Sequence, residues 1–462
     1  LAPCDGHPSD YFGWQVAGLS PRAVSVSAYT QNTVYVFEVD ATRNWTQTAS
    51  WRSSQDIYHF YGYTLAAVSD DTVIIGDYFE NNYGSQNGHP YSCTGGVEVY
   101  MQAGPGALWI LQAHLQSSAP TSYQYFGWSI AALGSDRIIV GASRDGIAGT
   151  NVGSAYIFHR ANDTTWHHED ILLPLSKQDR ALGNNTFFGH AVAGSANGKS
   201  VLLASEYDGV VLLFEWTGAG GWVQRQRWTN WGVSSKFVDK LGYNHSGSNF
   251  GWAVELVNCA TNTISNSAAA APSCEVDAAC GQLWACGGSS CCGCDTTCLI
   301  YGDCCDDACD VCGEGLCTSN FTITSAIDDK SNYCLAVSGT SASTGSATSA
   351  GASYVYVRNT TGKWYEQPSS GFDNVDVIVN SSSSNAIAPI SPNRLVVGCV
   401  QCTTSSGLDT GTAYIRRFNG THWIQETELV ANDGELLASS QGAQYFGYSV
   451  AGFTLYQNYS DY

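Results

Sequence analysis

Two kinds of residue in the sequence could carry out chemistry: histidines beside carboxylates, and isolated carboxylates along the chain. The segment Trp166-His167-His168-Glu169-Asp170 joins two imidazoles to two carboxylates. We expect it to be a strand, and neighbouring side chains of a strand point to opposite faces, so the two histidines cannot bind one metal ion. A glycoside hydrolase needs a pair of carboxylates, whereas the segments expected nearest the centre of the molecule carry a single acid, Glu255.

The sequence also lacks the motifs of common enzymes. It has no serine-hydrolase elbow, zinc-protease motif, phosphate-binding loop or dinucleotide-binding fingerprint. Asp306, Asp307 and Asp310 lie close together among cysteines, where a solvated surface is the expected role. We therefore predict that the protein is not an enzyme and has no catalytic residue, no cofactor and no metal site.

Cysteine is the remaining reactive residue, and its use indicates disulfide bonds. The chain has 18 cysteines, of which 12 lie between Cys274 and Cys317. A zinc site is the competing interpretation, but this cluster contains no histidine, and such cysteine density is typical of secreted chains. We predict disulfide bonds for Cys4, Cys93, Cys259, Cys274, Cys280, Cys286, Cys291, Cys292, Cys294, Cys298, Cys304, Cys305, Cys309, Cys312, Cys317, Cys334, Cys399 and Cys402.

Three pairs are predicted outside the cluster, while the connectivity inside it stays open. The pairs are Cys259–Cys334, on strands expected to be adjacent, Cys399–Cys402, which could close a small loop, and Cys4–Cys93, which remains by elimination.

Sites of glycosylation are frequent. Nine N-x-S/T sequences predict N-linked glycans at Asn44, Asn162, Asn184, Asn244, Asn320, Asn359, Asn380, Asn419 and Asn458. Two tracts rich in Ser, Thr, Gly and Ala, residues 338–353 and 381–384, could carry O-linked glycans.

The composition indicates an extracellular protein. With 19 basic and 40 acidic residues the formal charge is −21, which disfavours binding to nucleic acid or to an anionic membrane surface. No apolar run approaches the roughly 18 residues that a membrane span needs. The first residue, Leu1, is what removal of a signal peptide would leave. We expect a chain of the secretory pathway that acts outside the cell or at its surface.

The segments that would hold these residues repeat along the chain. An aromatic-Gly-aromatic signature, followed by small and apolar residues, opens each repeat. The starts are Phe12-Gly13-Trp14, Tyr61-Gly62-Tyr63, Phe126-Gly127-Trp128, Phe188-Gly189-His190, Phe250-Gly251-Trp252 and Phe446-Gly447-Tyr448, and a diverged start lies at Asn385-Ala386-Ile387-Ala388.

Three further segments follow each start in the same order. They are a short apolar run such as 73–76, a run that alternates aromatic and aliphatic residues such as 97–100, and a segment that opens on tryptophan. Four short strands in about 60 residues are typical of a propeller blade, so the predicted fold is an all-β propeller of four-stranded blades. We expect the second strand to be covered on both faces, and the third to alternate between buried and exposed positions because it lies nearer the rim.

The tryptophans that open the fourth segments could form a sugar-binding ladder. Their equal placement in every repeat favours packing between blades instead. These residues are Trp45, Trp109, Trp166, Trp222, Trp364 and Trp423.

The repeat starts, with second strands such as Val140-Gly141-Ala142, resemble the FG-GAP repeat family, the propeller at the amino end of integrin α chains. This resemblance covers nearly all of the chain outside one insertion and implies a propeller at the cell surface. The chain departs from the family in lacking its acidic calcium loop. The corresponding loops, 69–71, 134–136, 195–198 and 391–393, supply one or two carboxylates, whereas calcium takes six to eight oxygen ligands.

The number of blades stays open between six and seven. Six repeats are complete, and the start at Phe446 supplies only a first strand before Tyr462. Because a propeller must close to protect its edges, the ring has six blades, or seven with further sequence, or is completed by a strand from a neighbouring chain, which would form a polymer.

The insertion lies in the fifth repeat, which starts at Phe250 and reaches its second strand only at Leu335. Its spacing C-x-C-x3-C-x5-CC from Cys292 to Cys305 resembles the somatomedin B domain, which implies a small disulfide-stabilised module that docks proteins. Four cysteines exceed that family's eight. The predicted domains are 1–265 for the first propeller part, 266–320 for the disulfide-rich insert and 321–462 for the second propeller part.

The expected function is that of a non-enzymatic extracellular glycoprotein that acts through protein–protein contacts. It would be an adhesion module or a structural subunit of an extracellular layer or filament, with other proteins or further copies of itself as partners. The alternative is a carbohydrate-binding or carbohydrate-hydrolysing propeller.

Overall fold

The computed structural model describes slightly more than half of the chain. The described residues are 1, 3, 5, 10–40, 42–53, 60–81, 93–104, 106–161, 165–174, 185–205, 209–218, 221–229, 250–258, 282–287, 290–294, 333–339, 352–358, 364–366, 383–391, 394–400, 411–418, 423–430 and 446–452. The chain forms two compact units: one of Leu1–Leu175, Leu182–Ala260 and Asn332–Tyr462, the other of Ser176–Ala181 and Thr261–Ser331.

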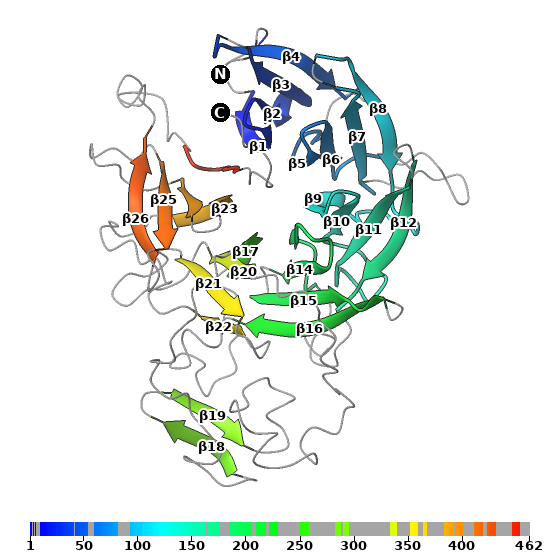
Figure 1. Cartoon of the computed structure of the whole chain (residues 1–462). Coiled ribbons are helices and arrows are strands. Elements are labelled where there is room, and N and C mark those ends of the chain that lie inside the picture. The colour runs from blue at the N-terminus through cyan, green and yellow to red at the C-terminus, as the bar shows by residue number, and fades with distance from the viewer. Residues whose placement is uncertain are drawn as a thin grey trace. The chain divides into compact units, whose positions relative to one another are not determined.

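The larger unit is a β-propeller, as predicted. Its described part contains six four-stranded antiparallel sheets, each with strands in sequence order from the centre to the rim (Figure 1). The blades are β1 (Phe12–Ser20), β2 (Ala23–Ala28), β3 (Thr33–Val39) and β4 (Trp45–Arg52); β5 (Thr64–Ser69), β6 (Thr72–Asp77), β7 (Gly96–Gln102) and β8 (Trp109–Leu115); β9 (Phe126–Leu133), β10 (Arg137–Ala142), β11 (Ser154–Ala161) and β12 (Thr165–Leu172); β13 (Ala191–Gly194), β14 (Ser200–Ser205), β15 (Val210–Trp216) and β16 (Trp222–Thr229); β17 (Phe250–Asn258), β20 (Tyr333–Gly339), β21 (Ala352–Arg358) and β22 (Trp364–Glu366); and β23 (Ser383–Ser391), β24 (Arg394–Cys399), β25 (Thr412–Phe418) and β26 (Trp423–Leu429).

The predicted segments of the six blades form the expected strands, whereas the described residues 446–452 of the seventh repeat start form a single bridge at Phe446 and no strand. The burial of the third strand was also predicted wrongly. The second strand β6 is buried along its whole length, as its apolar sequence requires. The third strands β3 and β15 are buried over five and six consecutive residues, because neighbouring blades cover both of their faces. The alternation appears one strand further out, in β4, where half-buried and exposed residues alternate from Gln47 onwards.

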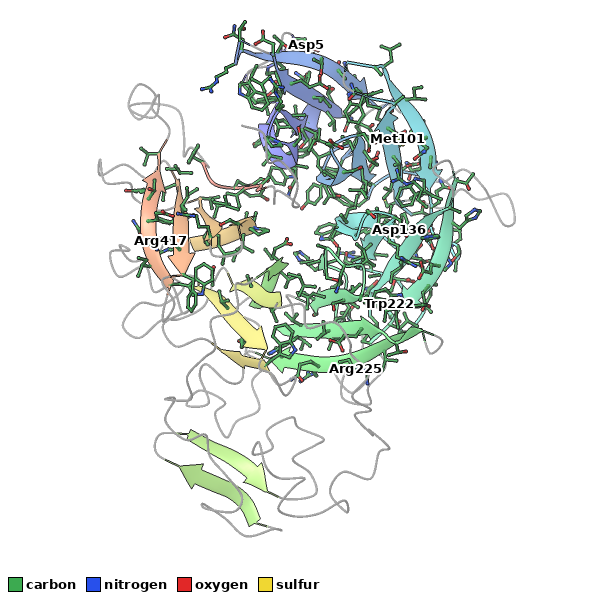
Figure 2. The ribbon with its side chains drawn as sticks, viewed as in Figure 1. Asp5, Met101, Asp136, Trp222, Arg225 and Arg417 are labelled. Carbon is green, nitrogen blue, oxygen red and sulfur yellow. The ribbon has the colours of Figure 1, made fainter. Side chains whose placement is uncertain are left out.

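Apolar side chains fill the spaces between consecutive blades (Figure 2). One cluster joins Ala17 and Leu19 of β1 to Val73 and Ile75 of β6, and comparable clusters join each following pair up to the sixth blade. Small residues on the inner strands permit this close approach, since the blades converge towards the centre.

In three of the described blades, a glycine before the third strand joins the blade to the next repeat start. Gly95, Gly153 and Gly411 each form a parallel bridge with the phenylalanine of the following FG pair. At Gly153 a Cβ atom would collide with the backbone of Phe188, and the glycine has a φ of 83°. Only glycine adopts this conformation without strain and leaves room for the neighbouring chain.

The last FG start occupies the inner position between the sixth and first blades, drawn in red in Figure 1. Phe446 bridges Gly411 of the sixth blade. On the other side the Ser449 hydroxyl accepts a hydrogen bond from the Val16 amide at 3.2 Å and donates one to Gln15 Oε1 at 3.2 Å. The described residues thus show six four-stranded blades and a seventh repeat start within the ring, and completion by a neighbouring chain stays a prediction.

The smaller unit is described at one hairpin, β18 (Gln282–Gly287) paired with β19 (Ser290–Cys294). The insertion leaves the propeller between the first and second strands of the fifth blade, which pair antiparallel with Val257 opposite Cys334. No described helix is long and apolar enough to cross a membrane.

Candidate binding surface

A chain of aromatic rings follows the repeat starts around the ring of blades. The residue after each FG glycine contacts its counterpart in the next repeat. Ring centroids are 4.3 Å apart for Tyr448–Trp14, 5.5 Å for Trp14–Tyr63, 5.3 Å for Tyr63–Trp128 and 5.5 Å for Trp128–His190. These side chains come from the seventh repeat start and the first four blades, and all are half-buried.

A second set of rings surrounds the first. It comes from the residue before each FG pair and from the loops between second and third strands. Tyr29 and Tyr78 each pack on Phe60, at 5.9 and 5.1 Å, and Tyr78 also contacts Trp128 at 4.7 Å. We call the connected set the aromatic sector: Tyr11, Trp14, Tyr29, Phe60, Tyr63, Tyr78, Phe79, Tyr125, Trp128, His190 and Tyr448.

Ionisation in the aromatic sector is suppressed by burial. Desolvation raises the pKa of the Tyr78 and Tyr448 phenols well above the ordinary value. Desolvation also lowers the pKa of His190 to about 4. These three side chains therefore stay uncharged at physiological pH.

Several of the residues that bear these rings have a strained backbone conformation. Tyr11, Tyr125 and Phe187, each directly before an FG pair, have φ of 53°, 57° and 56°. A bulky residue seldom adopts this left-handed region, and holding it there costs about 1–3 kcal/mol. Tyr123 is also left-handed at 62° and is 53% exposed.

Replacement of Tyr123 by asparagine is expected to raise the free energy of unfolding by about 1 kcal/mol, because asparagine tolerates the left-handed region. Denaturant unfolding at low protein concentration measures the change. Tyr123→Ala, which removes the ring but keeps the strain, is the control and should not stabilise the fold. Equal stabilities of the two variants would contradict a strained Tyr123.

One cation lies among these rings. The Arg144 guanidinium is 4.8 Å from the centre of the Tyr125 ring and 5.6 Å from that of Phe187. Arginine, tyrosine and tryptophan are the residues that most often dominate the energy of protein interfaces. The sequence interpretation missed Tyr11, Phe60, Tyr125 and Arg144, although the repeated aromatic before FG was a usable signal.

The tryptophans that open the fourth strands pack inside and between blades, as predicted. Trp222 and Trp423 are buried, and Trp364 lies 5.6 Å from Trp228 of the preceding blade. The Trp166 indole donates to Gln112 Oε1 of the second blade at 3.0 Å. Trp45 differs, because it is 42% exposed.

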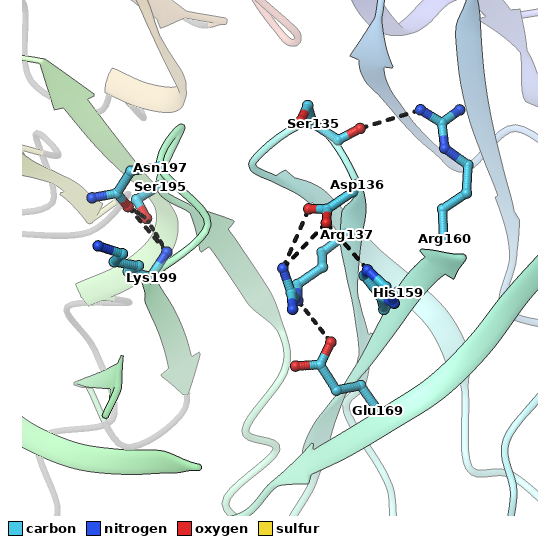
Figure 3. A network of polar contacts seen from close by, with 9 residues as sticks. All are labelled: Ser135, Asp136, Arg137, His159, Arg160, Glu169, Ser195, Asn197 and Lys199. Carbon is cyan, nitrogen blue, oxygen red and sulfur yellow. Dashed lines mark hydrogen bonds and ion pairs between the residues drawn. The ribbon is translucent and has the colours of Figure 1, made fainter. Parts of the chain in front are cut away.

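Two of the loops that correspond to the calcium loop of the resembled family, 134–136 and 195–198, use their oxygen atoms internally (Figure 3). Asp136 forms an ion pair with Arg137 at 3.3 Å, and its Oδ2 lies 3.2 Å from His159 Nε2. Asn197 Oδ1 accepts from the Ser195 hydroxyl and the Lys199 amide at 2.7 and 3.0 Å. Protein cations and donors thus surround these groups, and the described residues contain no cluster of three metal-ligating side chains.

His167 and His168 have different neighbours, as a strand requires. The His168 ring lies 5.7 Å from that of Tyr156 and 5.6 Å from that of Phe158, and burial lowers its pKa. His167 Nε2 instead lies 3.2 Å from Thr165 Oγ1. The two imidazoles do not form a site.

Glu255 stands at a position that is alanine in the other FG repeats. The fifth residue after the aromatic start is Ala17, Ala66, Ala131, Ala193 and Ala451 in those repeats. Residues two apart on a strand share a face, so Glu255 lies on the face of β17 where Ala253 packs against Ile387 and Leu395 of the sixth blade. Desolvation raises the pKa of the Glu255 carboxyl to about 8, and this acid stands between two blades.

The disulfide predictions have mixed outcomes. Cys399 is disulfide-bonded, while its predicted partner Cys402 lies outside the described residues. Cys93 is a free, buried thiol, so its predicted pairing with Cys4 is wrong. Cys4 itself lies outside the described residues; Asp5, the residue after it, accepts a hydrogen bond at Oδ1 from the Tyr35 hydroxyl of the first blade at 2.9 Å.

The remaining cysteine and glycan predictions are mostly outside the described part. Cys259 lies outside the described residues; the strand that ends one residue before it, β17, pairs with β20, which contains Cys334. In the cluster the backbone places Cys286 opposite Cys291. Among the predicted glycan sites the structure describes Asn44, which is exposed in the turn before β4, and its Nδ2 donates to Thr42 Oγ1 at 2.9 Å.

Comparison with known protein families supports the assignment of the repeats to the FG-GAP type. Residues 109–158 match the FG-GAP repeat family. No curated protein matches the chain.

Solved structures with a similar fold include Sqt1 of Saccharomyces cerevisiae, with 11% identity, a TM-score of 0.40, and coverage of 91% of this chain and 75% of that one. A Lactobacillus plantarum protein has 11% identity, a TM-score of 0.43, and coverage of 91% and 85%. A putative 6-phosphogluconolactonase from Bacteroides uniformis has 11% identity, a TM-score of 0.45, and coverage of 91% and 85%.

Proposed function

We propose that this FG-GAP propeller is a secreted, non-enzymatic glycoprotein that acts through protein–protein contacts. The observation that carries the proposal is the aromatic sector, which joins rings from four blades and the seventh repeat start. Rigid aromatic side chains with an arginine supply large contact areas at low entropic cost, as in the centres of protein interfaces. The nine glycan sequences and the cysteine density support an extracellular location.

The disulfide-rich insert is the second contact element of this proposal. Its resemblance to the somatomedin B domain suggests a protein-docking module, and its position at the turn between β17 and β20 leaves the blade itself intact. The protein would then serve as an adhesion module or as a subunit of an extracellular layer or filament.

Deletion of residues 274–317, replaced by a short Gly-Ser linker, is expected to weaken protein binding while the propeller stays folded. Binding is measured on an array of extracellular proteins that includes this chain, and folding by circular dichroism and thermal unfolding. A wild-type protein that is strictly monomeric and binds no protein on the array would overturn the proposal. Mass spectrometry of the secreted chain tests the glycans separately.

Carbohydrate binding is the second candidate, favoured by the same rings. Sugar stacking needs a free ring face, however, and many faces in the sector cover one another: Phe60 and Tyr78 are stacked at 15°, as are Tyr125 and Trp128. Binding on a glycan array, or hydrolysis lost in Glu255→Gln, would favour this second function.

A further inference from the structure

The aromatic sector holds tryptophan and tyrosine side chains, which can each lose one electron, in continuous ring contact. Trp14 is the junction of these contacts. Its ring centroid lies 4.3 Å from that of Tyr448, 4.4 Å from that of Tyr29, 5.5 Å from that of Tyr63 and 6.3 Å from that of Tyr11. The rate of electron transfer falls steeply with the distance between two rings, so transfer is fast between rings in contact. An electron removed from Trp14 can therefore be replaced from a neighbouring ring.

The second tryptophan of the sector, Trp128, is connected to Trp14 through Tyr63. Its ring lies 5.3 Å from that of Tyr63 and 4.7 Å from that of Tyr78. Both indoles pack among the repeat starts, and the contact of Trp14 with Tyr448 joins the two ends of the chain. Oxidation of either indole to a polar product would place a polar group in this packing, at a cost in stability. Transfer of the radical to another residue would protect both tryptophans.

The inner tyrosines of the sector are poor sites for a lasting radical. A tyrosine that loses an electron also releases its phenolic proton, and this release needs water or a base. Desolvation raises the pKa of the Tyr29, Tyr78 and Tyr448 phenols, because burial opposes loss of the proton. We therefore expect the radical to end on a tyrosine that water reaches.

Two described tyrosines are exposed to water, and they differ in their contact with the aromatic sector. Tyr11 is 51% exposed and Tyr123 is 53% exposed. The Tyr11 ring contacts Trp14 and lies 5.4 Å from the Tyr29 ring, whereas no described ring contacts that of Tyr123. Tyr11 thus combines access to water with contact to the junction. Tyr123 is equally exposed without that contact, which makes it a matched control.

A positive charge disfavours a radical at the opposite end of the sector. The Arg144 guanidinium lies 4.8 Å from the centre of the Tyr125 ring, and Tyr125 is the sector residue nearest to Tyr123 in the sequence. A cation beside a ring opposes removal of an electron, because the ring would become positive next to it. Transfer is therefore favoured towards Trp14 and Tyr11.

We propose that the aromatic sector transfers one-electron oxidation from its tryptophans to Tyr11, which is a site of oxidative modification. A one-electron oxidant of the inorganic-radical class takes an electron from Trp14 or Trp128 and is reduced to its anion. Tyr11 then gives an electron to the oxidised indole and its phenolic proton to water, which restores the indole and leaves a neutral tyrosyl radical. Two such radicals on separate molecules couple through a carbon–carbon bond between their rings, and one ring hydrogen of each moves to its oxygen as a proton. The product is dityrosine. No partner protein is required, so the proposal is independent of the proposed binding function.

Pulse radiolysis in azide solution tests the transfer, because the azide radical oxidises tryptophan in preference to tyrosine. Transient absorption of the secreted full-length protein follows the decay of the tryptophanyl radical and the growth of the tyrosyl radical. We expect growth at a rate independent of protein concentration, as transfer within one molecule requires. The Tyr11 contribution should be lost in Tyr11→Phe and in Trp14→Phe and kept in Tyr123→Phe, since phenylalanine keeps a ring but is not oxidised. Other pairs among the 14 tryptophans and 26 tyrosines contribute equally to the two tyrosine variants, so their difference isolates Tyr11.

Peptide mapping by mass spectrometry after continuous irradiation gives a second readout that needs no variant. In the wild type we expect Tyr11 to be modified several-fold more than Tyr123, and dityrosine to link peptides that contain Tyr11. In Tyr11→Phe, whose folding is verified by circular dichroism, oxidation of Trp14 should increase instead. Equal tyrosyl yields in Tyr11→Phe and Tyr123→Phe, equal modification of Tyr11 and Tyr123 in the wild type, or oxidation that ends on the buried thiol of Cys93 would overturn the proposal.

Discussion

Replacement of Gly153 by alanine is expected to lower the free energy of unfolding by between about 2 and 5 kcal/mol, one of the largest effects of any single change in the propeller. Gly153 precedes β11 with a φ of 83°, and a Cβ atom there would meet the nitrogen, carbonyl carbon and oxygen of Phe188. Backbone atoms cannot rotate away, so the third and fourth blades would have to separate. Denaturant unfolding measures the loss.

Gly218 provides the matched control for this prediction. It has a φ of 73°, but nothing lies within 4 Å of the position its Cβ would take. Gly218→Ala should therefore lower the free energy of unfolding only by the cost of holding alanine in the left-handed region, about 1–2 kcal/mol. Similar losses in the two variants would show that the close approach between blades contributes nothing.

Replacement of Glu255 by alanine is expected to stabilise the propeller increasingly as the pH rises from about 4.5 to about 8. The folded carboxyl has a pKa of about 8, above its ordinary value of 4.5. Below pH 4.5 the Glu255 carboxyl is protonated in both the folded and the unfolded chain, so its desolvation does not lower the free energy of unfolding. Between the two values only the unfolded chain releases it, so the wild-type free energy of unfolding falls by up to about 1.4 kcal/mol per pH unit.

Alanine fits this position because the other FG repeats have it there. Urea unfolding of both proteins across that pH range gives the difference. The control is Glu426→Ala, whose exposed carboxyl pairs with Arg394 at 2.6 Å; this ion pair lowers the pKa of Glu426, so its small contribution is present at neutral pH and disappears as the pH falls. A pH-independent difference between wild type and Glu255→Ala would contradict a desolvated carboxyl between the blades.

The order of strands was predictable because each strand is marked by a short pattern of residues within its own segment. Trp45, Trp109 and Trp222 begin β4, β8 and β16 as expected, and the diverged start near Ala386 does form the inner strand β23. Such signals need only neighbouring residues, since apolar runs and turn residues define strands wherever they lie in the fold.

The candidate site was less predictable, because its members are distant in sequence. The post-FG aromatics were visible as a pattern, but the contact of Trp14 with Tyr448 joins the two ends of the chain. Cys93 shows the same limit: pairing by elimination assumed that every cysteine forms a disulfide bond, whereas Cys93 is a free, buried thiol.

Local sequence patterns were enough to predict a propeller of four-stranded blades, because each blade is a local unit with its own apolar runs, turns and FG start. The structure was needed to show that the aromatic residues form one continuous sector, that Asp136 contacts Arg137 and His159, and that Glu255 stands between two blades. Those features depend on side chains that separate repeats bring together, and the geometry of the ring, rather than any segment within it, sets their distances.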